Sequence, residues 1–104
     1  MNFENDKNAF KPIKSPVILD FTNCKHIGEI HKIIKKEFDL PEYYGENLSA
    51  LWDCLDYYCN NQLTVYIAGF YKVSDELNDY MEKIWRIFER VHQNSPNITF
   101  EIIS

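Results

Sequence analysis

The stretch Leu40–Cys59, LPEYYGENLSALWDCLDYYC, decides how the rest of the chain is arranged. Leu40 precedes Pro41, and a residue before proline avoids helical backbone angles, so any preceding helix ends here. Gly45 allows a turn, and Asn47 is a residue type that caps a helix by accepting a hydrogen bond from a free backbone N–H group. The stretch therefore predicts a loop followed by a helix that begins after Asn47.

This predicted helix is amphipathic. At about 100° per residue, roughly one third of its circumference carries the apolar residues Leu48, Leu51, Trp52, Leu55 and Cys59. The nearly opposite side carries the polar residues Glu46, Ser49, Asp53 and Asp56. We expect the first set to face the core and the second to face solvent, with Trp52 at the edge between them.

Acidic side chains dominate this part of the chain. No Lys or Arg occurs from Glu37 to Tyr71, a range that contains Glu37, Asp39, Glu42, Glu46, Asp53 and Asp56. An ordinary amphipathic helix with a solvated charged side explains part of this pattern, but such helices commonly interleave Lys with Glu. The unbalanced acid and the aromatic residues beside it favour a surface that binds something basic.

Two segments, Leu40–Leu48 (LPEYYGENL) and Ala50–Leu55 (ALWDCL), resemble the central segment of the barstar family, intracellular inhibitors of a secreted bacterial ribonuclease. The order of strands and helices agrees with that family from about Pro16 to Ser104. The resemblance implies that Asp53 acts as a phosphate mimic that enters the nuclease active site. It also implies partner contacts at Tyr43, Gly45, Asn47, Trp52 and Asp53.

The chain departs from the family at three positions. Ser49 stands where the family has an aspartate, Tyr58 where it has a tryptophan, and Arg90 where a glutamate comes from the last long helix. We expect Glu46 or Asp56 to compensate for the lost acid. The predicted partner-binding residues are therefore Tyr43, Gly45, Glu46, Asn47, Ser49, Trp52, Asp53, Asp56 and Tyr58.

Length and composition indicate one globular domain. The chain has 104 residues, of which 45% are hydrophobic and 15% aromatic, enough for one modest core. Eleven Lys and Arg against 16 Asp and Glu give a net charge of −5. This balance argues against direct binding to nucleic acid and favours a protein partner that is itself basic.

The cysteines and the hydropathy indicate a reduced, cytoplasmic protein that does not bind a membrane. Cys24, Cys54 and Cys59 are odd in number and lack the spacing of a zinc site, so we expect them to be reduced. No signal peptide and no apolar run of about 20 residues is visible.

The remaining sequence predicts an α/β fold, with a small three-stranded, mostly parallel sheet (β-α-α-β-α-β) packed against helices, as in the barstar family. The runs Pro16–Phe21 and Leu63–Ala68 are apolar throughout and predict strands with little room for solvent on either face. A third strand is expected over Ile98–Ile103. Residues 1–15 are expected to form a polar arm, and residues 16–104 a single domain.

Two further helices are predicted around these strands. One follows a cap at Thr22 or Asn23 and runs through Lys36, and the other is capped by Ser74. The second has a core stripe of Leu77, Met81, Ile84 or Trp85, Phe88 and Val91. His26 and His31 have no partner at helical spacing and no nucleophile nearby, so we expect both to be solvated helix residues.

Enzyme chemistry has little support in the sequence. The glycines do not form a phosphate-binding loop, and no G-x-S-x-G or H-E-x-x-H motif occurs. Asp53 and Asp56, with Glu46, lack the neutral oxygen ligands of a dedicated cation site. We therefore predict no enzymatic activity, no metal and no cofactor.

The leading hypothesis is a monomeric inhibitor that forms a 1:1 complex with a basic ribonuclease or nuclease toxin and occludes its active site. The alternative is a binding module of the same fold for a basic protein that is not a nuclease. A small hydrolase is the third hypothesis.

Overall fold

A computed structural model describes residues 15–57 and 62–103. The arm predicted over residues 1–15 lies outside these residues except for Ser15, and so do Tyr58 and Cys59. Among the helices of the described residues, none is long and apolar enough to cross a membrane.

Three strands form one parallel sheet: β1 (Val17–Asp20), β2 (Leu63–Ala68) and β3 (Ile98–Ile103). They lie side by side in chain order, with β2 at the centre. Parallel neighbours require a crossover connection, and each connection here contains helix.

The first crossover holds α2 (Ile27–Glu37) and α3 (Leu48–Asp56), and the second holds a short 3₁₀ turn, η1 (Asp75–Leu77), and α4 (Asn78–Asn94). This order confirms the predicted β-α-α-β-α-β arrangement, and both strand pairings of the described sheet are parallel.

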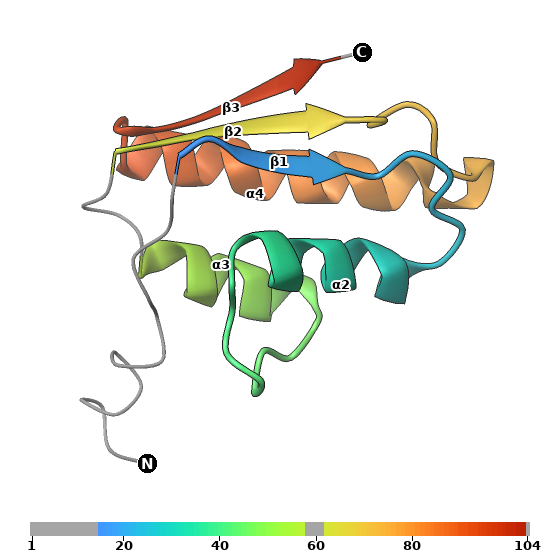
Figure 1. Ribbon diagram of the computed structural model, residues 1–104, viewed down its shortest axis with the longest axis horizontal. Coiled ribbons are helices and arrows are strands. Elements are labelled where there is room, and N and C mark those ends of the chain that lie inside the picture. The colour runs from blue at the N-terminus through green and yellow to red at the C-terminus, as the bar shows by residue number, and fades with distance from the viewer. Residues whose placement is uncertain (1–14, 58–61, 104) are drawn as a thin grey trace.

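All three α-helices lie on one side of the sheet (Figure 1). Helix α2 packs on β1, α4 packs on β3, and α3 packs on α4. The core between these layers contains the inward side chains of the strands and the apolar stripes of the helices. The predicted stripe of α4 is confirmed, because Met81, Ile84, Phe88 and Val91 are buried. The ring of Phe88 stacks on that of Phe100 in β3, with the ring centroids 4.5 Å apart.

None of the described helices covers the other side of the sheet (Figure 1), so the expectation that β1 and β2 are buried on both faces is wrong. Burial alternates along both strands, and Ile18 is 52% exposed. The register brings Ile18, Tyr66 and Glu101 side by side on this face. Both alternating sets of β1 contain apolar residues, so the sequence could not show that helices cover only one face.

The cap predicted for α3 is confirmed. Asn47 Oδ1 accepts a hydrogen bond from the Ala50 N–H at 2.8 Å, and Asn47 Nδ2 donates to the Gly45 carbonyl at 3.1 Å. The side chain therefore fixes both the start of the helix and the turn before it.

The cap predicted at Thr22 or Asn23 for α2 is wrong, whereas the cap predicted at Ser74 is confirmed in position only. Ser74 is the N-cap residue of η1, which precedes α4 and has Asp75 and Glu76 in its first turn. Helix α2 begins only at Ile27, after His26, and neither His26 nor Ser74 makes a side-chain capping bond. Asn23 instead has φ 67° and donates its N–H to the Lys72 carbonyl at 2.9 Å. The segment after β1 is thus hydrogen-bonded to the loop after β2, and α2 begins only after this contact.

Candidate functional site

The loop between α2 and α3 is shaped by two residues in the left-handed region and by its own hydrogen bonds. Asp39 and Glu46 have φ values of 51° and 52°, a conformation that costs a non-glycine residue roughly 1–2 kcal/mol. Leu40 N–H donates to the Lys35 carbonyl, and Tyr44 N–H donates to the Pro41 carbonyl, both at 2.9 Å. Strained backbone of this kind persists where surrounding contacts impose it, and it is common at binding sites.

A buried cluster fastens this loop to the helices. Tyr44 is buried, and its hydroxyl lies 2.6 Å from Nδ1 of His31 in α2. The other ring nitrogen of His31, Nε2, lies 2.5 Å from the hydroxyl of Tyr80 in α4. The expectation that His31 is solvated is therefore wrong, because its side chain is fully buried. His26 is exposed, as expected.

Burial also governs the protonation of this cluster. Removal from water lowers the pKa of His31, and the nearby Glu46 carboxylate opposes this effect. The same loss of solvation raises the pKa of the Tyr44 and Tyr80 hydroxyls. All three side chains are therefore held in their neutral forms.

Most of the predicted partner-binding residues reach the surface. Trp52 is half-buried, and Tyr58 lies outside the described residues. The others are exposed: Tyr43, Gly45, Glu46, Asn47, Ser49, Asp53 and Asp56. The predicted division of α3 into a core side and a solvent side is thus confirmed in its described part, where Leu51 and Leu55 are buried.

Three of these residues line one groove between α3 and α4, with a volume of about 720 Å³. Ser49 and Asp53 contribute polar side chains from α3. The apolar lining is formed by Leu48, Trp52 and Ile87, which are partly buried against the core. Such a groove, with apolar walls and charged side chains around them, has the composition of a protein-binding surface.

The side of the groove formed by α4 is basic, a feature that the sequence analysis missed apart from Arg90. Lys83, Arg86 and Arg90 all line it. Their spacing of three and four residues places them on one stripe of α4, and this spacing is the signal that could have identified them. We call these three residues the α4 basic row.

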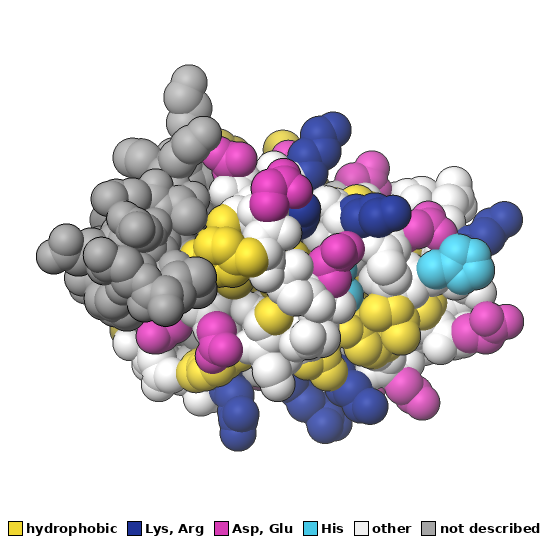
Figure 2. Space-filling view, turned by 90° about the horizontal axis from the view of Figure 1, so that it is seen from below, with side chains coloured by type: hydrophobic (Ala, Val, Ile, Leu, Met, Phe, Trp, Pro, Cys, Tyr) yellow, Lys and Arg dark blue, Asp and Glu magenta, His cyan; other side chains and the backbone are white. Residues whose placement is uncertain are grey.

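The surface around α3 is therefore mixed in charge. Figure 2 shows the helical side of the molecule, where acidic and basic side chains are interspersed. Within residues 15–57 and 62–103, the one ion pair shorter than 4.0 Å joins Lys35 Nζ to Glu42 Oε2, at 3.1 Å. Asp53 and the α4 basic row are thus not paired with one another at that distance.

The Cys54 thiol of α3 is not activated as a nucleophile. Burial, with a smaller contribution from Asp53, raises the pKa of the Cys54 thiol to about 11. This thiol is protonated near neutral pH and is a poor nucleophile. No group of three His, Cys, Asp or Glu side chains in the described part of the chain is arranged to hold a metal ion.

The fold and the site define a small α/β domain that presents a loop and the start of a helix beside a charged groove. Residues 15–103 match the family described as Barstar (barnase inhibitor). The chain also resembles a protein of Bacillus subtilis (strain 168) described as "Putative ribonuclease inhibitor YrdF". The two are 30% identical over 77 residues, which cover 74% of this chain and 85% of the relative. The chain belongs to the barstar family.

Proposed function

We propose that this protein inhibits a ribonuclease or a nuclease toxin by occluding the enzyme's active site with α3 and the loop before it. Family membership and the description of the Bacillus subtilis relative support a ribonuclease-inhibitor role. The observation that carries the proposal is Asp53, an exposed carboxylate without an ion pair among the described residues, beside the half-buried ring of Trp52.

A carboxylate in this position suits the chemistry of a ribonuclease. Such an enzyme holds a phosphodiester with Arg and Lys side chains, and these make charge-assisted hydrogen bonds to any well-placed anionic oxygen. Among the described residues, Asp53 has no ion pair to break before it binds. Buried Leu51 and Leu55 anchor α3, so the carboxylate is held on a rigid element.

The remaining predicted residues extend the proposed contact. Tyr43, in the loop before α3, is 51% exposed and offers an aromatic surface that loses little conformational entropy on binding. We also propose contacts at Gly45, Glu46, Asn47, Ser49, Asp56 and Tyr58. The proposed inhibitor is a cytoplasmic monomer without enzymatic activity that forms a 1:1 complex through residues 16–104.

Inhibition of barnase tests the proposal, with wild type compared with Asp53→Ala at low and at high salt. Loss of a hydrogen-bonded charge at an interface costs about 2–5 kcal/mol, so we expect the inhibition constant to rise at least about 30-fold. Asp75→Ala is the matched control, since it removes the same charge at η1, which does not line the groove. If Asp53→Ala inhibits as well as wild type while both are folded, Asp53 is not a phosphate mimic.

A second candidate function is the binding of a basic protein that is not a nuclease. It is favoured by Ser49 and Arg90, which line the groove and stand where the resemblance to the barstar family implies acidic residues. Copurification from the producing organism distinguishes the two functions, because only the first requires the captured protein to degrade RNA and to lose that activity in the complex.

A further inference from the structure

The groove between α3 and α4 has sides of opposite charge. Asp53 lies on the α3 side, whereas Lys83, Arg86 and Arg90 lie on the α4 side, and all four side chains are exposed. No ion pair shorter than 4.0 Å joins them in the described part of the chain. Glu89 of α4 also lines the groove, between Arg86 and Arg90 in the sequence. The groove therefore offers anions and cations that are not paired with one another to whatever enters it.

This arrangement disfavours a partner that brings only cations. A basic side chain that approaches Asp53 also approaches the α4 basic row, and like charges brought together at an interface weaken binding. The partly buried Trp52 and Ile87 make the groove less polar than open solvent, which strengthens both attraction and repulsion.

We infer that the groove accepts a partner segment that carries a carboxylate next to its basic group. The basic group pairs with Asp53, and the carboxylate pairs with Arg90 or Arg86. Arginine suits this role because its planar guanidinium binds a carboxylate through two parallel hydrogen bonds. The inference rests on the proposed function, because it specifies which ribonuclease surface the inhibitor fits.

A nucleic acid is a poorer occupant of the same groove. The basic row could contact phosphates, but Asp53 and Glu89 line the groove as well. The chain has a net charge of −5, which repels a polyanion at long range. A protein segment with both charges matches both sides of the groove.

The basic row is then a selectivity device. Specific binding often depends on repulsion of the wrong partner as much as on attraction of the right one. Here the row weakens binding to nucleases that present only cations, and it favours a nuclease whose active-site rim includes a carboxylate. Arg90 and Arg86 determine this preference, while Asp53 supplies the contact with the phosphate-binding cations.

Binding to catalytically inactive barnase, and to a set of its single Lys→Glu and Arg→Glu variants, tests the inference. The inhibitors compared are wild type, Arg90→Glu, Arg86→Glu and the control Lys72→Glu. Lys72 is exposed and does not line this groove. Lys72→Glu therefore changes the net charge of the protein by the same amount as Arg90→Glu, but at a site outside the groove. Unfolding in urea verifies that each variant is folded.

We expect Arg90→Glu to bind unmodified barnase at least tenfold more tightly than Lys72→Glu does. We also expect one or more barnase reversals to tighten binding to wild type and to weaken binding to Arg90→Glu. If Arg90→Glu and Lys72→Glu change affinity equally, and no barnase reversal couples to Arg90 or Arg86, the inference is overturned.

Two further measurements separate the alternatives. Binding of a single-stranded oligouridylate that is lost in Arg90→Glu would overturn the inference in favour of RNA. Asp53→Ala, measured in the same titrations, tests the proposed function separately from the α4 basic row. If Asp53→Ala loses binding and no effect is specific to Arg90, the proposed function stands. The inference that the partner segment carries a carboxylate is then overturned.

Discussion

Tyr44 Oη lies 2.6 Å from His31 Nδ1, so a buried hydrogen bond ties the loop before α3 to α2. On the opposite side of the ring, His31 Nε2 lies 2.5 Å from the hydroxyl of the half-buried Tyr80. A neutral imidazole has one donor and one acceptor. We assign the buried Tyr44 hydroxyl as donor to Nδ1 and the Nε2–H as donor to Tyr80, whose own proton can then reach solvent. The arrangement joins α2, the loop and α4 through one side chain.

Removal of the Tyr44 hydroxyl should destabilise the protein. Tyr44→Phe leaves Nδ1 of a fully buried His31 without a partner, and an unsatisfied buried polar group costs about 1–3 kcal/mol. Tyr80→Phe is the matched control and should cost less, because Tyr80 is partly exposed and water can replace its hydroxyl. Urea unfolding measures both. Equal stability of Tyr44→Phe and wild type would show that the hydrogen bond does not hold the loop.

His31 should make stability depend on pH below its ordinary pKa of 6.5. Burial lowers its pKa in the folded state, so the unfolded chain binds its proton more readily. This contribution is fully present above pH 6.5 and is lost as the pH falls from there toward the folded pKa. We expect the free energy of unfolding to fall over that interval in wild type and to change less in His31→Gln. An identical pH profile for the two proteins would contradict this assignment.

The cap of α3 could be predicted from sequence because it depends on neighbours. Asn47 accepts from Ala50, three residues away, and a residue type at a fixed offset is enough to indicate it. The burial of His31 could not be predicted in this way. Its partners Tyr44 and Tyr80 lie 13 and 49 residues away, so its environment exists only in the folded chain.

The charge of the groove could not be predicted from the sequence either, because it depends on how two helices pack. The stripe of Lys83, Arg86 and Arg90 can be identified from its spacing, but the sequence does not reveal that this stripe faces Asp53. That fact follows from the packing of α3 on α4. The acidic run from Glu37 to Tyr71 therefore predicted the charge of α3 and not the charge of the surface around it.

Loss of the Asn47 side chain should weaken the start of α3. Asn47→Ala removes the acceptor for the Ala50 N–H and the donor to the Gly45 carbonyl, and loss of such a cap costs about 1 kcal/mol. Asn47→Asp keeps the acceptor and should retain most of the stability. Urea unfolding of the three proteins tests this. If Asn47→Asp is destabilised as much as Asn47→Ala, the capping bond contributes little.

Two glycines should respond in opposite ways to alanine. Gly69 has φ 69°, and an added Cβ would lie 2.3 Å from Thr22 Oγ1 and 2.5 Å from Thr22 N. Gly69→Ala should therefore lower the free energy of unfolding by more than the roughly 1–2 kcal/mol of the left-handed backbone alone. Gly28 in α2 has nothing within 4 Å of such a Cβ, and Gly28→Ala should stabilise the helix by up to about 1 kcal/mol. Thermal unfolding distinguishes the two, and equal effects would contradict this reading of the Thr22 contact.

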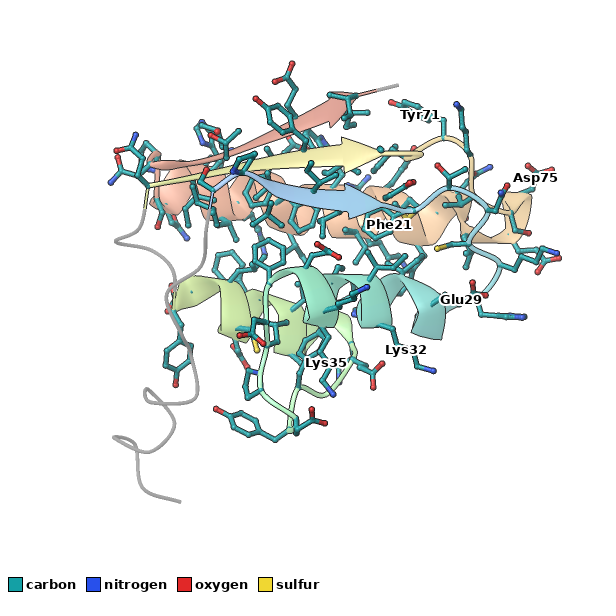
Figure 3. All side chains as sticks on the ribbon, viewed as in Figure 1. Phe21, Glu29, Lys32, Lys35, Tyr71 and Asp75 are labelled. Carbon is teal, nitrogen blue, oxygen red and sulfur yellow. The ribbon has the colours of Figure 1, made fainter. Side chains whose placement is uncertain are left out.

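Two exposed charges that Figure 3 labels, Lys32 on α2 and Asp75 in η1, offer controls away from the groove. Lys32 projects from α2 on the side away from the sheet, and Asp75 lies at the far end of the molecule in η1. Neither residue lines the groove. Substitution of either one should leave binding nearly unchanged apart from the long-range effect of net charge, which salt screens.

Ser49→Asp should raise both stability and affinity for a partner whose active site is basic. Helix α3 has no acidic residue in its first turn, and a carboxylate there interacts favourably with the helix dipole by about 0.3–1 kcal/mol. The new carboxylate would also line the groove that contains the α4 basic row, and it would reduce the repulsion that an all-cation partner meets. We expect barnase binding to tighten, and both gains to shrink as salt is added. Ser49→Asn is the control, because it matches the aspartate in shape without the charge. Equal behaviour of the two variants would mean that Ser49 does not report on the electrostatics of the groove.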